Sequence, residues 1–357
     1  MMPQPLTSVA TGDIVTHPIQ KFVVILGFVL NIVALVVANT WMKRQRQQKQ
    51  PTIDALPPRC WTWNRKRNCY WTLISFSLVF NITLDYFYDV STTWIYAKSY
   101  VFAFPIGILD LVFSSVTENG GGVSLRVIPG AMLWCSALYI QRYFQLLYFG
   151  DKCQNNDCDG MYIVDDLPLP YIWIPREFIR LFFQLLFMGL MSDMIFSPMH
   201  RLTHHPLLYK KLHKEHHTYT NNLTSLVLYH GTHLDDFLMP LTTAVGGFLY
   251  TLILHAVGLP TYIGFSNLTL YIGMINNLLS HAHDIRCSKL IAPLPDNLNF
   301  VAYHYVHHLN PNSNFGLTEP TDMLWDWILG VKTITKYNPD GSDTSTTVAE
   351  PLDKKKI

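Results

Sequence analysis

Charged residues are scarce in this sequence. Asp, Glu, Lys and Arg make up 14% of the 357 residues, whereas hydrophobic residues make up 49% and aromatic residues 13%. A chain with so few charges cannot cover a water-soluble globule of its size with polar surface, which favours a bilayer location. The net charge is only +1, so no general attraction to nucleic acid is expected, and we find no nucleic-acid-binding module.

Several common signatures are also missing. The six cysteines contain no CxxC pair; Cys153 and Cys158 flank a polar loop and either form one disulfide, if the loop is lumenal, or remain ordinary thiols. The HExxH motif of zincin proteases is absent because Glu215 directly precedes His216, which argues against a metalloprotease. Internal repeats, alternating strand patterns and inverted transporter repeats are absent too.

Long apolar runs are present. Residues Phe22 to Trp41 carry no charge over the length that a transmembrane helix needs, and the absence of a cleavage site favours an uncleaved anchor over a signal peptide. Residues 238–279 read as a helical hairpin that is broken at Gly258. Further spans are expected at 71–90, 100–116, 128–149 and 171–197.

Basic residues orient these spans. Lys43, Arg44, Arg46 and Lys49 follow the first span directly, which places residues 42–70 in the cytoplasm by the positive-inside rule. Five crossings followed by a hairpin then leave residues 200–217, 281–308 and the C-terminus on that same side. The last four residues, KKKI, have the dilysine form of an endoplasmic-reticulum retrieval signal, so we expect a multi-pass protein of that membrane.

The expected fold class is therefore all-α: a polytopic integral membrane helical bundle with a cytoplasmic histidine-rich metal site. Four regions are expected: an anchor helix with a basic cytoplasmic segment (1–70), additional transmembrane helices (71–185), a histidine-rich catalytic domain (186–331) and a polar, disordered tail (332–357).

The histidines carry the strongest functional signal. His200 and His204 are four residues apart and would share one helix face. A second box, with spacings of three and four, comprises His213, His216 and His217, and a third box at the same spacings comprises His304, His307 and His308. Neutral imidazole is a common ligand for iron, copper, nickel and zinc. Eight such ligands are too many for one ion and about right for two.

A lone histidine is more often a surface residue or a hydrogen-bonded core residue than a ligand. Under the same interpretation a basic run such as Lys210-Lys211 would merely face anionic lipid. This interpretation suits His17, His230 and His255. It does not suit three boxes together, which favour a metal. Possible further ligands are His205, His233 and His281. Carboxylates expected to hold ligand rings are Asp193, Asp236 and Asp284.

Taken in order, the three boxes resemble those of the fatty acid hydroxylase/sterol desaturase superfamily, over residues 186–331. Asp193, seven residues before the first box, fits this pattern, and His283-Asp284 resembles an isolated His-Asp pair of sterol C5-desaturases, which adds His283 to the expected ligands. The closing motif of the family resembles Asn314-Phe315-Gly316 and Trp325-Asp326 of this chain.

The resemblance implies two iron ions, dioxygen as oxidant, and electrons from cytochrome b5 or a similar carrier with its NAD(P)H reductase. No catalytic residue beyond the metal ligands is expected. The segment around His17 lacks the glycines of a cytochrome b5 motif, so the carrier is expected to be a separate protein.

Departures from the family pattern leave the subfamily open. NLTSL at 222–226 stands where C5-desaturases carry Thr-Pro-Phe-Ala-Ser, and Trp327 replaces an arginine of the closing motif. We expect hydroxylation or desaturation of a membrane lipid, with a sterol favoured. The alternatives are a fatty acyl, sphingolipid or alkane hydroxylase and, in a different class, a metal transporter or structural zinc protein. A transporter would place its histidines at mid-membrane depth, whereas these boxes flank the spans.

Overall fold

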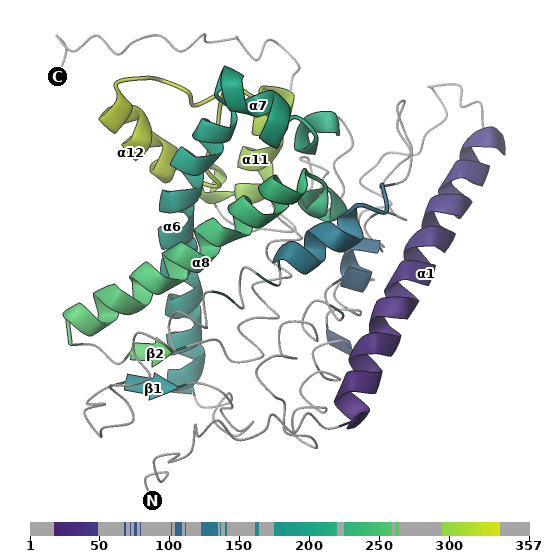
Figure 1. The fold of residues 1–357 in the computed structure, drawn as a ribbon. Helices are drawn as coiled ribbons and strands as arrows, with labels where there is room; N and C mark the ends of the chain where they lie inside the picture. Colours follow the sequence, from purple (N-terminus) through teal and green to yellow (C-terminus); the bar gives the residue numbers. More distant parts are fainter. Residues whose placement is uncertain are drawn as a thin grey trace, which may run out of the picture.

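A computed structural model of the chain (Figure 1) describes residues 18–48, 123–134, 161–163, 175–219, 225–258, 261–263 and 295–335, together with isolated positions between 68 and 140. The α-helices are α1 (Pro18–Gln48), α6 (Pro175–Thr203), α7 (Pro206–Leu212), α8 (His233–Ala256), α11 (Phe300–Leu309) and α12 (Glu319–Leu329). Short 3-10 helices are η2 (His216–Thr218), η3 (Ser225–Tyr229) and η5 (Asp296–Leu298).

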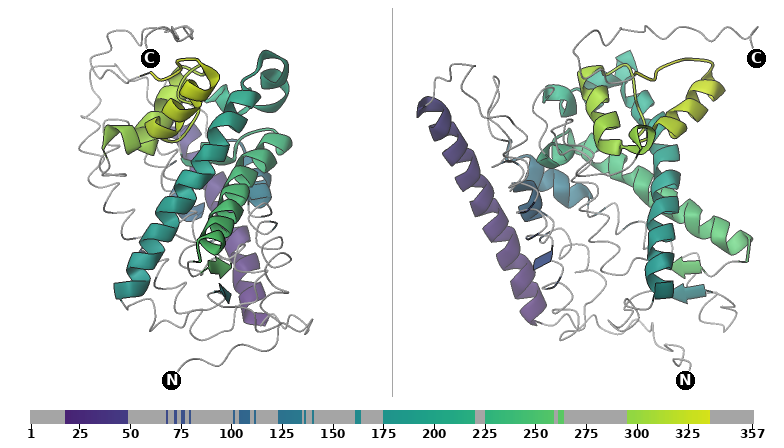
Figure 2. Two further views of the ribbon diagram at one scale, coloured as in Figure 1. Left: turned by 90° about the vertical axis from the view of Figure 1, so that its left-hand side faces the viewer. Right: turned by 180° about the vertical axis from the view of Figure 1, so that it is seen from behind.

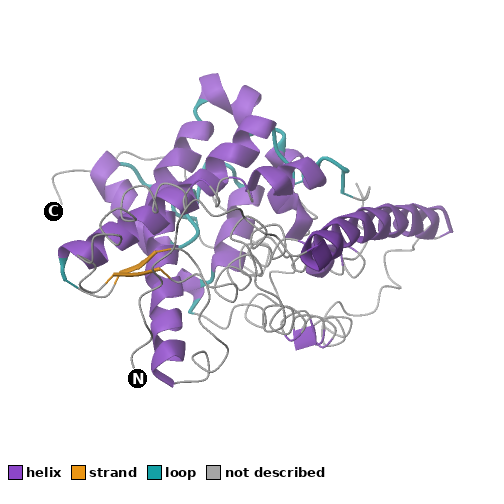
Figure 3. Cartoon of the chain, turned by 60° about the horizontal axis from the view of Figure 1, so that its bottom comes forward, coloured by secondary structure: helices purple, strands orange, loops and turns teal. Residues whose placement is uncertain are grey.

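Helices dominate the described residues, as Figure 3 shows, and the predicted helical fold is confirmed there. The sequence did not predict one small sheet, in which β1 (Met161–Ile163) pairs in parallel with β2 (Thr261–Ile263). Strands of three residues are too short to give a recognisable alternation of apolar and polar positions. The sheet lies at the end of α6 farthest from α7 (Figure 1).

Two described helices are long and apolar enough to cross a membrane: the segment Phe22–Trp41 of α1, as predicted, and α8. The predicted span 171–197 coincides largely with α6, which continues to Thr203. α8 is the first arm of the predicted hairpin and ends just before Gly258, whose φ is +69°. The second arm and most of the spans expected between 71 and 149 lie outside the described residues, so the number of crossings stays a prediction.

The surface of α1 is apolar. Phe22 and Val37 are more than half exposed, whereas Leu35 on the opposite side is fully buried. An exposed apolar surface of this size marks contact with lipid or a partner. Two asparagines of this helix bond to other segments: the Asn31 amide donates to the Val101 carbonyl at 3.1 Å, and the Asn39 amide donates to that of Val123 at 2.9 Å.

α6 and α8 cross closely and form the frame of the molecule (Figures 1 and 2). Gly246 of α8 lies at the crossing: a Cβ there would come 2.5 Å from both the backbone N and the Cα of Ser192 on α6. Only glycine allows the two backbones to approach so closely. The close approach fixes where α6 packs along α8, and hence the position of the first histidine box at the end of α6.

Gly246→Ala is expected to destabilise the protein by about 1–3 kcal/mol, because the added methyl group must push the two helices apart. Gly189→Ala in α6 is the matched control, since a Cβ there meets nothing within 4 Å and the change improves helix propensity. Denaturant unfolding of both variants in the same detergent measures the difference. Equal stabilities would show that the crossing tolerates separation.

α12 closes onto α6 beyond the crossing. The Trp325 indole N–H donates to the Met194 carbonyl at 3.0 Å. α12 ends at Gly330 in the left-handed conformation, and the chain then folds back so that Thr333 donates to Asp326 through both its backbone N–H (2.7 Å) and its hydroxyl (2.8 Å). The first of these contacts holds α12 against α6. Residues 313–318, which lead into α12, are here called the 313–318 loop.

Candidate metal centre

The three histidine boxes meet at the end of α6 that lies beside α7 and α11 (Figure 1). His200 is in the last turn of α6, and the helix ends at Thr203. Pro206 then begins α7, a position that proline favours because its missing N–H would have no helical partner. This sharp turn returns the chain over the end of α6. It brings the second box beside the first, and α11 supplies the third.

The eight histidines of these boxes form two adjacent groups. In each group the nitrogen atoms that could bind a metal all lie within 4.8 Å of one another. The two groups touch through ring pairs with centroids 4.9 Å apart (His213 and His216) and 4.7 Å apart (His217 and His308). The group of five consists of His200, His204, His213, His217 and His307, and the group of three consists of His216, His304 and His308. His204 is partly exposed and the other seven are buried.

The 313–318 loop orients one ring from α6 and one from α11. Nδ1 of His200 lies 2.6 Å from the Phe315 carbonyl, and Nδ1 of His307 lies 2.6 Å from the Ser313 carbonyl. A carbonyl oxygen can only accept, so both rings must donate from Nδ1. Each neutral ring therefore keeps its lone pair on Nε2.

Two rings of the second box are held in the same way from other elements. Nδ1 of His213 lies 2.9 Å from the Asp235 carboxylate, and Nδ1 of His216 lies 3.2 Å from the His230 carbonyl. These acceptors again fix the proton on Nδ1 and the lone pair on Nε2. Oxygen acceptors behind ligating imidazoles are the usual arrangement in metal sites.

The facing nitrogens fit a metal and do not fit a hydrogen bond. Nε2 of His200 lies 2.8 Å from Nε2 of His213. Both atoms carry lone pairs, so the contact is repulsive unless a cation draws them together. Two nitrogens bound at right angles to one ion, each at 2.0–2.1 Å, would lie about 3 Å apart. In addition, Nε2 of His204 and Nδ1 of His217 are buried with no hydrogen-bond partner among the described residues.

Burial keeps these rings neutral, as metal ligands must be. It lowers the pKa of His216 to about 3, and it lowers the pKa values of His204, His213, His217 and His308, with the neighbouring imidazoles acting in the same direction. Desolvation disfavours the charged imidazolium. The ring nitrogens therefore remain available as donors at neutral pH.

The carboxylate that meets a histidine ring is Asp235, one residue before the predicted Asp236. Thr232 caps α8 and accepts from the Asp235 N–H at 3.2 Å, which turns the Asp235 side chain toward His213. The carboxylate of Asp236 lies instead beside Gly130 and Gly231. The sequence placed two acids in the first turn of this helix without indicating which one faces the site.

Asp235→Asn is expected to weaken metal binding by about 10–100-fold, because the amide binds the Nδ1 proton of His213 less strongly than a carboxylate does. Asp236→Asn removes the same charge one residue away, leaves the bond to His213 in place, and should change affinity less. Competition with a chelator measures both affinities. A larger loss of metal affinity in the Asp236 variant would show that Asp236, as predicted from the sequence, is the carboxylate that supports the ligands.

Asp193, the other predicted carboxylate among the described residues, bonds to the 313–318 loop rather than to a histidine ring. It accepts from the Leu317 N–H and the Thr318 hydroxyl, both at 2.7 Å. Space at Gly316 is tight, because a Cβ would lie 3.1 Å from the Asp193 carboxylate and 3.2 Å from that of Asp322. Asp193 thus fixes the backbone of the loop whose Phe315 and Ser313 carbonyls accept from His200 and His307.

Asp322 is a site residue that sequence analysis missed. Its fully buried carboxylate accepts from the Gly316 N–H at 2.9 Å, the Tyr303 hydroxyl at 2.8 Å and the Ser197 hydroxyl at 2.6 Å, and it pairs with Arg201 at 3.2 Å. It thereby joins α6, α11, α12 and the loop. Partners 125 residues away in sequence leave no local signal.

Other predicted residues lie apart from both groups. His205 is the exposed N-cap of α7, where its ring accepts from the Leu207 N–H at 3.4 Å. His233 is the exposed first residue of α8, and His255, expected to be a bystander, is exposed near the end of that helix. His17, His281, His283 and Asp284 lie outside the described residues.

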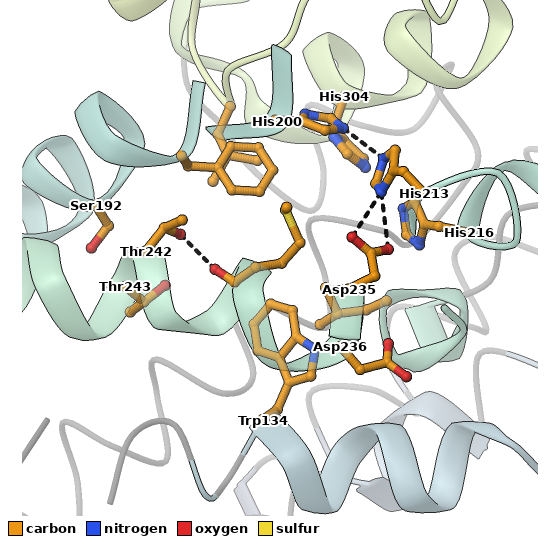
Figure 4. Close-up of a pocket in the computed structure, with 14 residues that line it drawn as sticks. Trp134, Ser192, His200, His213, His216, Asp235, Asp236, Thr242, Thr243 and His304 are labelled. Carbon is orange, nitrogen blue, oxygen red and sulfur yellow. Dashed lines mark hydrogen bonds and ion pairs between the residues drawn. The ribbon is translucent and has the colours of Figure 1, made fainter. Parts of the chain in front are cut away.

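A cavity of about 50 Å³ adjoins both groups, between α6 and α8 (Figure 4). Its upper right end in the figure is formed by His200, His213, His216 and His304, and its other end by Ser192, Thr242 and Thr243. Apolar side chains between these ends include Trp134, Phe196, Leu228 and Met239. The volume accommodates a few molecules the size of water or dioxygen.

Comparison with known proteins identifies the region that contains the site. Residues 185–331 match the fatty acid hydroxylase family. Lathosterol oxidase of Mus musculus is 30% identical over 159 residues, which are 44% of this chain and 47% of that protein. Lathosterol oxidase of Homo sapiens is 32% identical over 142 residues, 39% of this chain and 41% of that protein.

A third relative, fatty acid hydroxylase domain-containing protein 2 of Homo sapiens, is 28% identical over 135 residues, 38% of this chain and 35% of that protein. The chain spans about half the length of the curated relatives it matches, or less. No solved structure matches it. The resemblance found in the three boxes is confirmed: residues 185–331 match the fatty acid hydroxylase family, and the lathosterol oxidases are similar over much of the same region.

Proposed function

We propose that this chain is a membrane-embedded non-haem di-iron oxidase that hydroxylates or desaturates a lipid, with a sterol as the favoured substrate. The observation that carries the proposal is the convergence of eight histidines, from three separate boxes, into adjacent groups of five and three. A structural zinc site uses four protein ligands. Eight neutral imidazoles side by side suit two ions of a metal that prefers nitrogen donors.

Under this proposal the chain binds and orients the metal ions. Nε2 atoms of His200, His213, His216 and His307 would hold them, because their Nδ1 atoms are committed to oxygen acceptors. His283 remains a proposed ligand on the motif resemblance. When bound, iron would supply the dioxygen activation needed to break an unactivated C–H bond. The surrounding burial excludes bulk water, which protects such chemistry from side reactions.

The stoichiometry requires an external reductant. Hydroxylation consumes dioxygen, two electrons and two protons, and yields the alcohol and one water. Desaturation consumes the same reactants, removes two hydrogens from adjacent carbons and yields two waters. We propose a cytochrome b5-type carrier with its NAD(P)H reductase as the electron source.

The substrate proposal rests on the relatives and on the apolar surface. Two relatives are named lathosterol oxidases, and the third is named for a fatty acid hydroxylase domain. The cavity of about 50 Å³ has room for dioxygen beside the histidines but not for a whole lipid. Only the reacting segment of the substrate would therefore enter between α6 and α8, while the rest stays in the bilayer. Fatty acyl and sphingolipid substrates remain the alternative.

The contacts of α1 support the proposed orientation in the endoplasmic-reticulum membrane. Asn39, near the basic end of α1, is tied to Val123, and the neighbouring Ser124 N–H donates to the Tyr219 hydroxyl at 3.3 Å, two residues after His217. Arg126 pairs with Glu215 within the second box. The basic residues after the first span and the histidines thus lie at one end of the molecule. The positive-inside rule would make that end cytosolic.

Expression in a host with a defined sterol and lipid composition tests the function. Mass spectrometry of the lipids should reveal a product that is one oxygen heavier or two hydrogens lighter, in a metal-dependent manner. The control is a His307→Ala form at equal abundance. A chain that holds two iron ions, receives electrons and leaves sterols, acyl lipids and sphingolipids unchanged would contradict the proposal.

A further inference from the structure

α7, together with Lys214 just after it, has an exposed face on the side away from the group of five. Leu207, Lys210 and Lys211 are spaced three and four residues apart on α7, so their side chains share one side of the helix, and Lys214 follows in the next turn. Leu207 is 77% exposed, and the three lysines are exposed. These four residues are here called the α7 face: an apolar contact point with three positive charges around it.

The other side of α7 touches the metal centre. The ring of Tyr209 stacks on His204 with centroids 5.2 Å apart and planes at 28°, and it lies 6.0 Å from the ring of His217. Tyr209 is only partly buried, and His204 is the one histidine of the eight that is partly exposed. On this side, a partly exposed tyrosine of α7 is thus in contact with the partly exposed histidine of the group of five.

Among the described residues, no carboxylate pairs with the three lysines of this face. The segment from His204 to Lys214 contains three lysines and no acidic residue, and the next acid, Glu215, is engaged by Arg126. A cluster of one sign speeds the encounter with a partner of opposite charge. Complexes between electron-transfer partners bury little surface, less than about 1,200 Å², so a face as small as this one is sufficient.

We propose that the α7 face is the docking surface for an acidic, one-electron carrier protein, with Tyr209 lying between the carrier and His204. The inference rests on the proposed function, which requires two electrons per turnover. In each of two dockings the carrier is oxidised and the metal centre gains one electron. Leu207 supplies the apolar contact at the centre of the interface, and the lysines pair with carboxylates around the redox group of the carrier.

The test uses the full-length, iron-loaded protein in nanodiscs with purified, reduced cytochrome b5 as the probe. In the variant Lys210→Glu/Lys211→Glu/Lys214→Glu, the second-order rate of cytochrome oxidation should fall at least 10-fold at low salt and lose most of its dependence on ionic strength. Turnover driven by dithionite, which needs no docking surface, should stay within twofold of the parent. Triple replacement by Gln should give a smaller fall in the same direction.

The matched control compares single charge reversals: Lys332→Glu, at another exposed position, should leave the cytochrome rate unchanged, whereas Lys211→Glu should lower it. An equal fall in both variants would mean that net charge, not the α7 face, governs the encounter. An unchanged cytochrome rate with weaker binding to phosphatidylserine vesicles would overturn the proposal in favour of a lipid-facing α7. If the parent oxidises cytochrome b5 but forms no lipid product, the proposed function fails while the docking measurement still stands.

Discussion

His200→Ala is expected to abolish product formation, with a loss well beyond the 10–100-fold typical of residues that stand behind metal ligands. The ring contributes Nε2 to the group of five, and its Nδ1 is bonded to the Phe315 carbonyl at 2.6 Å. Alanine removes both contacts, and each neighbouring histidine of the group already supplies its own nitrogen to the site. The measurement is product formed per mole of folded protein, with iron content determined on the same sample.

His304→Ala should separate the two groups. It leaves the group of three with two described histidines, while the group of five is intact. Iron content should therefore fall from two ions toward one per chain, and activity should be lost because both ions are required. His255→Ala, on the exposed end of α8, is the control and should keep full iron and activity. Two ions retained in an active His304→Ala protein would refute the division into two groups.

Asp322→Ala is expected to be the most destabilising change outside the histidines, at about 3–5 kcal/mol, because several buried donors lose their acceptor at once. It would remove the acceptor of the Tyr303 hydroxyl and the Gly316 N–H, and it would leave Arg201 with Asp326, at 2.8 Å, as its remaining partner. Activity should fall with stability, because a displaced Gly316 carries with it the Phe315 carbonyl that orients His200. Denaturant unfolding and metal affinity, measured together, test both effects.

The control for this experiment is Glu319→Gln, an acid in the first turn of the same helix that is not buried. A surface change of this kind usually alters stability by less than about 0.5 kcal/mol. Asp322→Asn should fall between the two, since an amide keeps the volume but turns N–H groups toward the donors around it. Stabilities within 1 kcal/mol of the parent for the alanine form would mean that the carboxylate network is not needed.

The sequence was sufficient to identify the histidines that come together but not how they divide. Spacings of three and four predict shared helix faces, and all eight box histidines do meet. The division could not be predicted because the second box does not form a regular helix: it passes from the end of α7 into the 3-10 helix η2. Adjacent residues there diverge, so His217 joins the first box and His216 joins the third.

The carboxylates show the same limit. Asp193 was found from its distance to the first box, yet its partners are Leu317 and Thr318, more than 120 residues away. Asp235 and Asp236 are both buried acids at one helix start, and side-chain direction, set by the cap at Thr232, decides between them. Helical spans follow from local apolar runs. Long-range hydrogen bonds between elements leave no comparable pattern.

The 313–318 loop also sets the order in which the site can be built. Its two carbonyls fix rings that belong to earlier boxes, and Asn314, at a φ of +53°, is held by the backbone of Thr335, with bonds of 2.8 and 3.0 Å. During synthesis every box histidine leaves the ribosome before the 313–318 loop and Thr335 have been made. Under the proposed function, metal loading is therefore expected late in biogenesis, because a nascent chain stopped at residue 312 would contain all eight histidines without the loop that orients His200 and His307.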